Sequence, residues 1–139
     1  MSGDKPGSGQ ERIRSILLID DEKDLCALLG DAFRARGFQV ESAHTCGEAL
    51  KCLARGRPDL ILLDLSLPDG EGLALLSHLR KSMPAPAVII TTAFGSEEVR
   101  SQAEQLGALG FLDKPYDEED VLRKIRSLGF PGGPRGQKR

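Results

Sequence analysis

The sequence predicts an α/β fold, a doubly wound parallel β-sheet with helices on both faces. Five short strand-like runs alternate with five segments of helical periodicity, and consecutive parallel strands need such long, right-handed crossovers. Three of the runs are apolar almost throughout, as in strands covered on both faces: residues 15–20, 60–64 and 87–91. A chain of 139 residues fits one domain of this kind.

The two remaining strands have a different composition. Residues 38–43 alternate apolar and polar side chains, with Gln39 and Glu41 on the polar face. This alternation suits an edge strand. Residues 110–113 predict a short fifth strand.

The first helix has the clearest amphipathic pattern, and Gly37 stands where that helix would stop. Its apolar positions are Leu25, Leu28, Leu29, Ala32 and Phe33. Further helices are predicted over residues 45–55, 71–81, 96–106 and 117–128. Because the fourth of these offers little apolar area to the sheet, we expect it to be loosely held and a candidate for motion.

The chain ends and the composition limit the classes of protein to which this sequence can belong. We expect a flexible leader over residues 1–12, a domain over residues 13–129 and a flexible, basic Gly/Pro-rich tail or linker over residues 130–139. A net charge of −2 provides no basic field for direct binding of nucleic acid. The apolar runs are too short to span a membrane, so a cytoplasmic protein is expected. The three cysteines form no CxxC or Cys/His cluster and indicate neither a disulfide framework nor a zinc site.

Reactive side chains gather where the predicted strands end. Asp20 and Asp21 follow the first strand, Asp64 ends the third, Thr92 follows the fourth and Lys114 follows the fifth. The carboxyl ends of parallel strands form the usual ligand crevice of such sheets. Three converging carboxylates repel one another unless they share a cation, and all-oxygen ligands favour Mg²⁺, with Mn²⁺ as a substitute.

Each residue also has an interpretation without function. Asp21 can cap the first helix, and Asp20 can be a polar strand end. Lys114 can lie along the surface, and Thr92 can be a β-branched strand residue. Asp64 is the hardest to explain in this way, because it directly follows an apolar run.

Four segments resemble the receiver domain of bacterial two-component response regulators. They are LLIDDE at residues 17–22, LDLSLPDG at 63–70, TAFG at 92–95 and FLDKP at 111–115. The resemblance covers roughly residues 14–128 and implies a flavodoxin-like sheet with strand order 2-1-3-4-5. The stretch from residue 92 to residue 115 is similar to receivers that precede ATPase-driven transcription activators.

The resemblance implies a role for each strand-end residue. Asp64 would accept a phosphoryl group from a sensor histidine kinase, a phosphotransfer protein or a small acyl phosphate, assisted by Lys114 and Thr92. Asp21, Asp64 and the backbone carbonyl of Ser66 would ligate Mg²⁺, and Asp20 would hold a metal-bound water. The protein would be a switch that catalyses its own phosphorylation and dephosphorylation, and would not be an enzyme acting on other substrates.

The resemblance also implies how the signal is passed on. Thr92 would move toward the phosphate and the aromatic ring of Phe111 would turn inward, although Phe111 can equally be ordinary core packing. The Lys114–Pro115 bond would be cis. An output partner would bind the face made by the fourth helix, the fifth strand and the fifth helix, and dimerisation would be linked to phosphorylation. Because Phe94 cannot orient water by a hydrogen bond, we expect a phosphorylated form that is not exceptionally short-lived.

Three other functions remain open from the sequence. A Mg²⁺-dependent phosphatase with an aspartyl nucleophile usually has its second Asp two residues after the first, whereas Asp20 and Asp21 are adjacent and Glu22 follows. An interaction module that is never phosphorylated would not need the acceptor set. A flavin-binding module would need a phosphate-binding loop after the first strand, which the sequence does not show.

Overall fold

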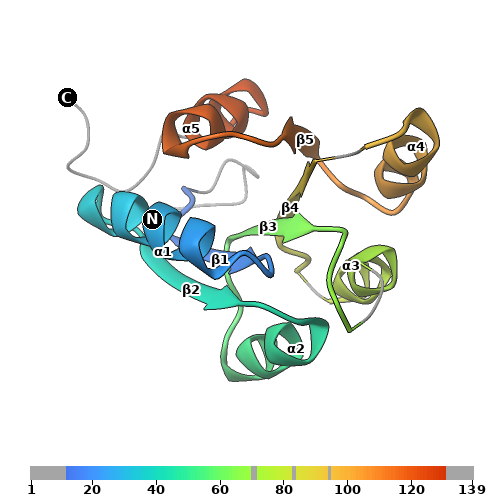
Figure 1. The fold of residues 1–139 in the computed structure, drawn as a ribbon, viewed down its shortest axis with the longest axis horizontal. Coiled ribbons are helices and arrows are strands. Elements are labelled where there is room, and N and C mark those ends of the chain that lie inside the picture. The colour runs from blue at the N-terminus through green and yellow to red at the C-terminus, as the bar shows by residue number, and fades with distance from the viewer. Residues whose placement is uncertain (1–11, 70–71, 83, 94, 131–139) are drawn as a thin grey trace, which may run out of the picture.

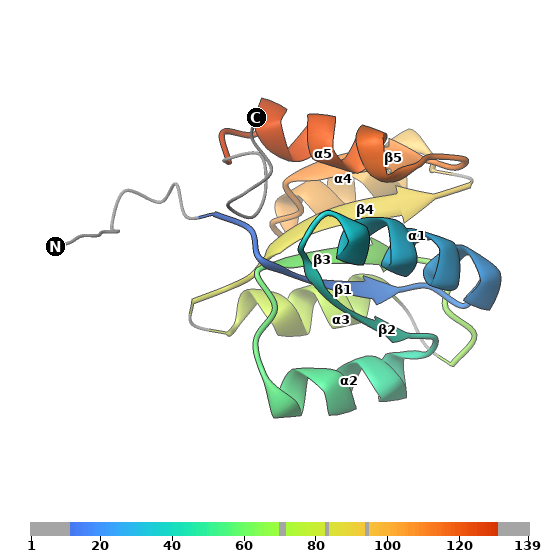
Figure 2. The same ribbon diagram turned by 90° about the vertical axis from the view of Figure 1, so that its left-hand side faces the viewer.

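The computed structural model describes residues 12–69, 72–82, 84–93 and 95–130. Its centre is a five-stranded parallel sheet with strand order β2-β1-β3-β4-β5, in which the strand arrows point the same way (Figure 2). The strands are β1 (Ser15–Ile19), β2 (Gln39–Ala43), β3 (Leu60–Asp64), β4 (Ala87–Thr92) and β5 (Gly110–Asp113). The predicted fold class and strand order are confirmed.

Helices cover both faces of this sheet (Figure 1). They are α1 (Lys23–Ala35), α2 (Cys46–Arg55), α3 (Gly72–Arg80), α4 (Glu97–Gln105) and α5 (Glu118–Ser127). Helices α1 and α5 pack on one face, where they share a buried cluster with Ile16 and Leu18 of β1. Helices α2, α3 and α4 pack on the other face, against Leu17 and Ile19. Successive residues of β1 therefore enter opposite cores, as the two-residue period of a strand requires.

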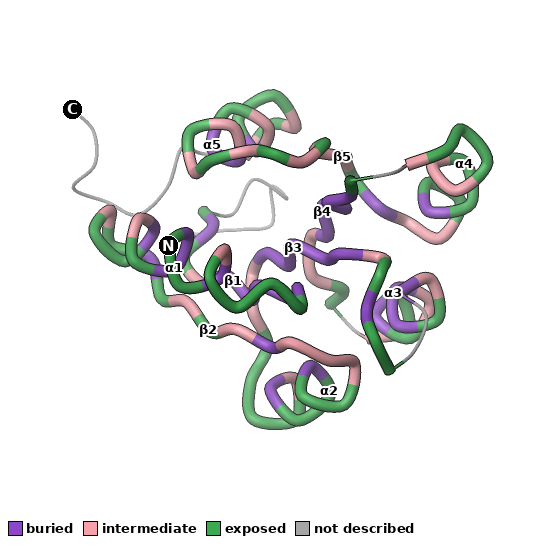
Figure 3. Tube along the Cα trace, viewed as in Figure 1, coloured by how far each residue is buried: buried purple, intermediate pink, exposed green. Residues whose placement is uncertain are grey.

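The three central strands are almost entirely buried. Every residue of β3 is buried, and Figure 3 shows the burial concentrated on the strands and on the inner sides of the helices. Strand β2 alternates exposed and half-buried residues up to the buried Ala43, and the strand order confirms its predicted edge position. No helix among the described residues is long and apolar enough to cross a membrane.

Most predicted bounds agree with the structure to within two residues. One residue of the first helix was assigned wrongly: Leu28 is 69% exposed, whereas Leu29 and Phe33 are buried. In α4 the only buried residue is Ala103, as expected for a weakly anchored helix. The predicted leader and tail lie almost wholly outside the described residues and stay predictions.

Candidate functional site

The site forms where the order of connection reverses, at the carboxyl ends of β1 and β3. These strands are direct neighbours, with Ile19 opposite Leu63, so the residues that follow, Asp20 and Asp64, lie side by side. Both side chains are buried, with 4% exposure each, while Asp21 is exposed. The two carboxylates therefore lie at the edge of the sheet where the sequence placed them.

The three carboxylates converge closely enough to share an ion. One oxygen from each of Asp20, Asp21 and Asp64 lies within 4.8 Å of the others. Backbone amides hold two of these side chains in place, because Glu22 N donates to Asp20 Oδ1 at 2.9 Å and Ser66 N donates to Asp64 Oδ1 at 2.9 Å. The buried Oδ2 of Asp20 accepts no hydrogen bond from the described residues. An all-oxygen cradle with such an unsatisfied buried acceptor fits a hard divalent cation.

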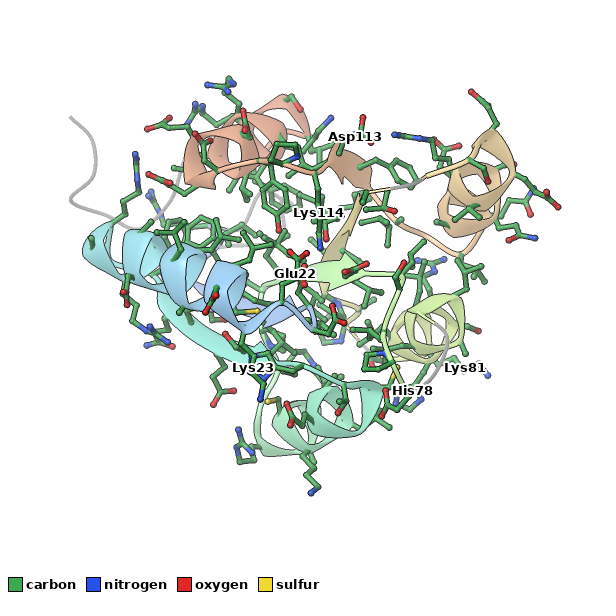
Figure 4. All side chains as sticks on the ribbon, in the orientation of Figure 1. Glu22, Lys23, His78, Lys81, Asp113 and Lys114 are labelled. Carbon is green, nitrogen blue, oxygen red and sulfur yellow. The ribbon has the colours of Figure 1, made fainter. Side chains whose placement is uncertain are left out.

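Lys114 supplies the positive charge of the site. Its Nζ lies 3.0 Å from Asp64 Oδ2 and 2.9 Å from Asp20 Oδ2, the latter an ion-pair contact without hydrogen-bond geometry. Glu22 Oε1 is a third carboxylate oxygen, 3.4 Å from Nζ. Figure 4 labels Glu22 and Lys114, which lie close to each other in this view. The Lys114–Pro115 peptide bond is cis, as predicted.

The charges of the site do not cancel fully. Burial raises the pKa of Asp20, and the close positive charge of Lys114 only partly opposes this effect. For Lys114, burial alone would lower the pKa, but the contacts with Asp20 and Asp64 outweigh it and raise the pKa overall. A carboxyl whose pKa stays raised beside a lysine is one that a further cation would stabilise.

The two predicted switch residues lie on neighbouring strands. Thr92 ends β4 and is buried, one residue beyond Thr91, which pairs with Asp64. Phe111 is half-buried in β5 and packs against the core that α4 joins. Ser66 is exposed in the loop after β3. Phe94 is outside the described residues, so the expectation about the lifetime of the phosphorylated form stays a prediction.

The structure removes one of the alternatives that the sequence left open. The N-cap residue of α1 is Glu22, and it makes no side-chain cap hydrogen bond. Asp21 is therefore not the cap of this helix. The acidic start of α5 is a true cap, with a capping box between Asp117 and Asp120.

Two residues near the site were missed from the sequence. The carboxylate of Glu22 reaches Lys114 through its side-chain conformation, which no sequence pattern predicts. The half-buried Tyr116 hydrogen-bonds with Thr91 through its phenol, and desolvation, together with the charge of Asp20, raises the pKa of this phenol. Tyr116 is the only tyrosine of the chain and follows Lys114-Pro115, which is the one signal that could have drawn attention to it.

Comparison with known proteins gives a consistent result. The family model of the response regulator receiver domain matches residues 16–126. The chain belongs to this family. As a receiver domain of the two-component response regulators, it is a phosphorylation-dependent signalling switch.

Three similar proteins illustrate the range of this receiver family. The photosynthetic apparatus regulatory protein RegA of Rhodobacter capsulatus is 32% identical over 84% of this chain and 63% of its own length. Sporulation initiation phosphotransferase F of Bacillus subtilis is 33% identical over 80% of this chain and 90% of its own. A response regulator of Burkholderia pseudomallei, solved with a phosphorylated aspartic acid, calcium ion and citrate, is 29% identical with a TM-score of 0.78, over 84% of this chain and 68% of that one. This receiver chain thus spans less than two thirds of RegA.

Proposed function

We propose that Asp64 is the phosphoacceptor of this receiver. In the reaction, a carboxylate oxygen of Asp64 attacks the phosphorus of a phosphohistidine or of a small acyl phosphate. A new P–O bond forms, the bond from phosphorus to the donor breaks, and the donor leaves with the bonding electron pair. In-line attack of water on the aspartyl phosphate later returns Asp64 and inorganic phosphate.

One observation carries this proposal. Three carboxylates with oxygens within 4.8 Å of one another meet a single ammonium group, whose Nζ is 3.0 Å from Asp64 Oδ2. Phosphoryl transfer depends mainly on alignment and on positive charge near the oxygens of the transferred group. Lys114 already contacts the acceptor oxygen, and the amide of Ser66 holds the other oxygen of Asp64 in position.

The acidic residues would hold Mg²⁺ or Mn²⁺. We assign Asp21, Asp64 and the carbonyl oxygen of Ser66 as direct ligands and Asp20 as the holder of a metal-bound water. When bound, the ion supplies positive charge to the phosphoryl oxygens. Asp20 and Asp21 would position the ion through their carboxylates. Lys114 would neutralise part of the negative charge on the transferred phosphoryl group.

The partners and the switch follow from the family. We propose a sensor histidine kinase or a phosphotransfer protein as the donor, and an output partner that binds the face made by α4, β5 and α5, with dimerisation linked to phosphorylation. Thr92 would donate to the phosphoryl group and Phe111 would turn inward. We further propose that residues 13–129 are the independent receiver unit and that the chain is of the type that precedes ATPase-driven activators.

The test is the intact mass of the protein after incubation with acetyl phosphate and Mg²⁺. We expect wild type to gain one phosphoryl group, Asp64→Asn to gain none, and removal of Mg²⁺ by a chelator to prevent the gain. Asp24→Asn, a change at an exposed carboxylate on α1, is the matched control and should behave like wild type. An unmodified wild type would favour the interaction module, and turnover of a generic phosphate monoester would favour the phosphatase.

A further inference from the structure

Arg100 of α4 contacts two residues of β5 at once. The guanidinium carbon of Arg100 lies 5.1 Å from the centroid of the Phe111 ring, and Nη2 donates to Asp113 Oδ1 at 2.6 Å. Phe111 and Asp113 are two residues apart and therefore lie on the same face of the strand. One side chain thus holds the ring and the end of this edge strand together.

The position of Arg100 in its own helix is unfavourable. Helix α4 begins at Glu97, so Arg100 lies in the first turn, where the helix dipole disfavours a cation. Local sequence rules are usually broken at functional positions, where a long-range contact compensates. Here the compensation is a carboxylate and an aromatic face on β5.

Arg100 also borders the turn that carries Thr92. A Cβ atom built on Gly95 would lie 2.8 Å from Thr92 Cγ2 and 3.6 Å from Arg100 Nε. A side chain at residue 95 would therefore clash with the methyl group of Thr92 and would also contact Arg100. A shift of Thr92 toward Asp64 would therefore open space beside residue 95, which Arg100 borders.

These contacts matter because α4 has few others. Ala103 is its only buried residue, while the Arg100 side chain is 33% exposed and that of Asp113 is 73% exposed. A change in the position of Phe111 removes the π face on which Arg100 rests. An interaction that exists in only one of two conformational states favours that state by the free energy of the interaction.

We propose that Arg100 is the positioning residue of the switch: it holds Phe111 and α4 in the unphosphorylated arrangement and releases both when Phe111 turns inward. This inference rests on the proposed function. Loss of Arg100 enlarges the population of the receptive state, and a larger receptive fraction accepts phosphate faster. The aromatic ring, the carboxylate and the helix are coupled through one guanidinium group.

The experiment compares four proteins: wild type, Arg100→Gln, Arg100→Lys and Arg55→Gln. Arg55 pairs with Glu41 at 3.1 Å, far from the switch in the fold, and so controls for the loss of an exposed arginine salt bridge. The first readout is the rate of phosphorylation by acetyl phosphate, measured by intact mass. The second is ¹⁹F NMR of protein carrying 4-fluorophenylalanine, in which Phe111→Leu identifies the Phe111 signal among the five phenylalanines.

We expect Arg100→Gln to be phosphorylated ~3- to 10-fold faster than wild type, the range that one exposed ion pair and one cation–π contact can produce. Its Phe111 signal should move toward the position seen in wild type with beryllofluoride. Arg100→Lys keeps a cation and should lie between the two, and Arg55→Gln should match wild type. An Arg100→Gln protein with the rate and the Phe111 signal of wild type would overturn the role of Arg100 while leaving the proposed function intact. A wild type that gains no phosphoryl group would overturn both.

Discussion

The Asp20 side chain carries a charge that the fold buries without fully compensating it. It is 4% exposed, lies next to Asp64, and has one oxygen that accepts no hydrogen bond from the described residues. Lys114 contacts that oxygen but is shared with two other carboxylates. This buried carboxylate therefore lowers the free energy of unfolding of the protein, at the position where we propose that a cation binds.

The first prediction concerns this charge. In the absence of divalent cations, Asp20→Asn should increase the free energy of unfolding at neutral pH by about 1 kcal/mol, because it removes a desolvated charge and keeps the acceptor for Glu22 N. Urea unfolding of both proteins in the presence of a chelator measures the change. A less stable Asp20→Asn would show that Lys114 already compensates the carboxylate.

The stability difference between Asp20→Asn and wild type should also depend on pH, with the sign that the raised pKa of Asp20 implies. The pKa of Asp20 is raised in the folded state, so the folded protein binds this proton more tightly than the unfolded chain does. The ionised carboxylate therefore destabilises the fold above the folded pKa. This destabilisation is relieved as the pH falls through the folded pKa toward the unfolded value of 3.8. The stability advantage of Asp20→Asn should shrink over this window. An advantage that stays constant on acidification would contradict the assignment.

At the scale of single elements, two glycines have opposite requirements. A Cβ atom on Gly72, at the start of α3, would lie 2.6 Å from the Cα of Leu65, whereas one on Gly47, in α2, would meet nothing closer than 3.6 Å. Gly72 thus allows α3 to pack against the loop that follows Asp64. Gly47 has no such contact to preserve.

The second prediction follows from this difference. Gly72→Ala should lower the free energy of unfolding by about 1–3 kcal/mol, the usual effect of overpacking. Gly47→Ala should raise it by roughly 0.5–1 kcal/mol through the smaller entropy of the unfolded chain. Thermal unfolding of the pair, followed by circular dichroism, measures both. Two changes of the same sign would refute the packing argument.

The loop after β3 is also tied to α2. Asp69 accepts hydrogen bonds from the backbone amides of Cys46 and Gly47, at 2.7 and 3.1 Å. These donors at the helix start lower the pKa of Asp69. The carboxylate thus connects the segment after Asp64 to a neighbouring helix.

The third prediction is an acid-dependent loss of stability. A depressed folded pKa means that Asp69 stabilises the protein above its unfolded pKa of 3.8 and that this contribution is lost as the pH falls through the folded value. Asp69→Asn should therefore be less stable than wild type at neutral pH, with the difference vanishing in strong acid. Asp31→Asn, whose side chain is 85% exposed, serves as the control. A difference that persists below both pKa values would point to another cause.

The elements show what the sequence could and could not predict. Near-continuous apolar runs located β1, β3 and β4, because parallel strands covered on both faces are apolar throughout, and alternation located the edge strand β2. Strand ends located Asp20, Asp64 and Lys114. Leu28 was misassigned because it lies about 100° around α1 from Leu29, outside the face that meets the sheet. The contacts of Glu22 and Arg100 depend on long, flexible side chains reaching partners distant in sequence, which no local pattern contains.

At the scale of the whole molecule, the site joins segments from both halves of the chain. The three carboxylates come from the ends of β1 and β3, and the lysine comes from the connection between β5 and α5. A ligand that binds only the folded state stabilises it by an amount that grows with the logarithm of its concentration, reaching ~2.7 kcal/mol at 100 times Kd. Cation binding should therefore be measurable as an increase in the stability of the whole fold.

The fourth prediction uses this linkage. Mg²⁺ should raise the melting temperature of wild type in a concentration-dependent way, and Asp21→Asn should abolish most of the rise. The exposed Asp24→Asn should retain it. A rise of equal size in all three proteins would indicate nonspecific binding, and the cluster would then not be a metal site.

The most direct measurement of the central claim is the location of the phosphoryl group. After phosphorylation by acetyl phosphate with Mg²⁺, borohydride reduces an aspartyl phosphate to homoserine, and peptide mass spectrometry identifies the converted residue. Our account predicts conversion at Asp64 and, under the same conditions, no conversion at Asp20 or Asp21. Homoserine at any other aspartate, or none in a protein that has gained phosphate, would contradict it.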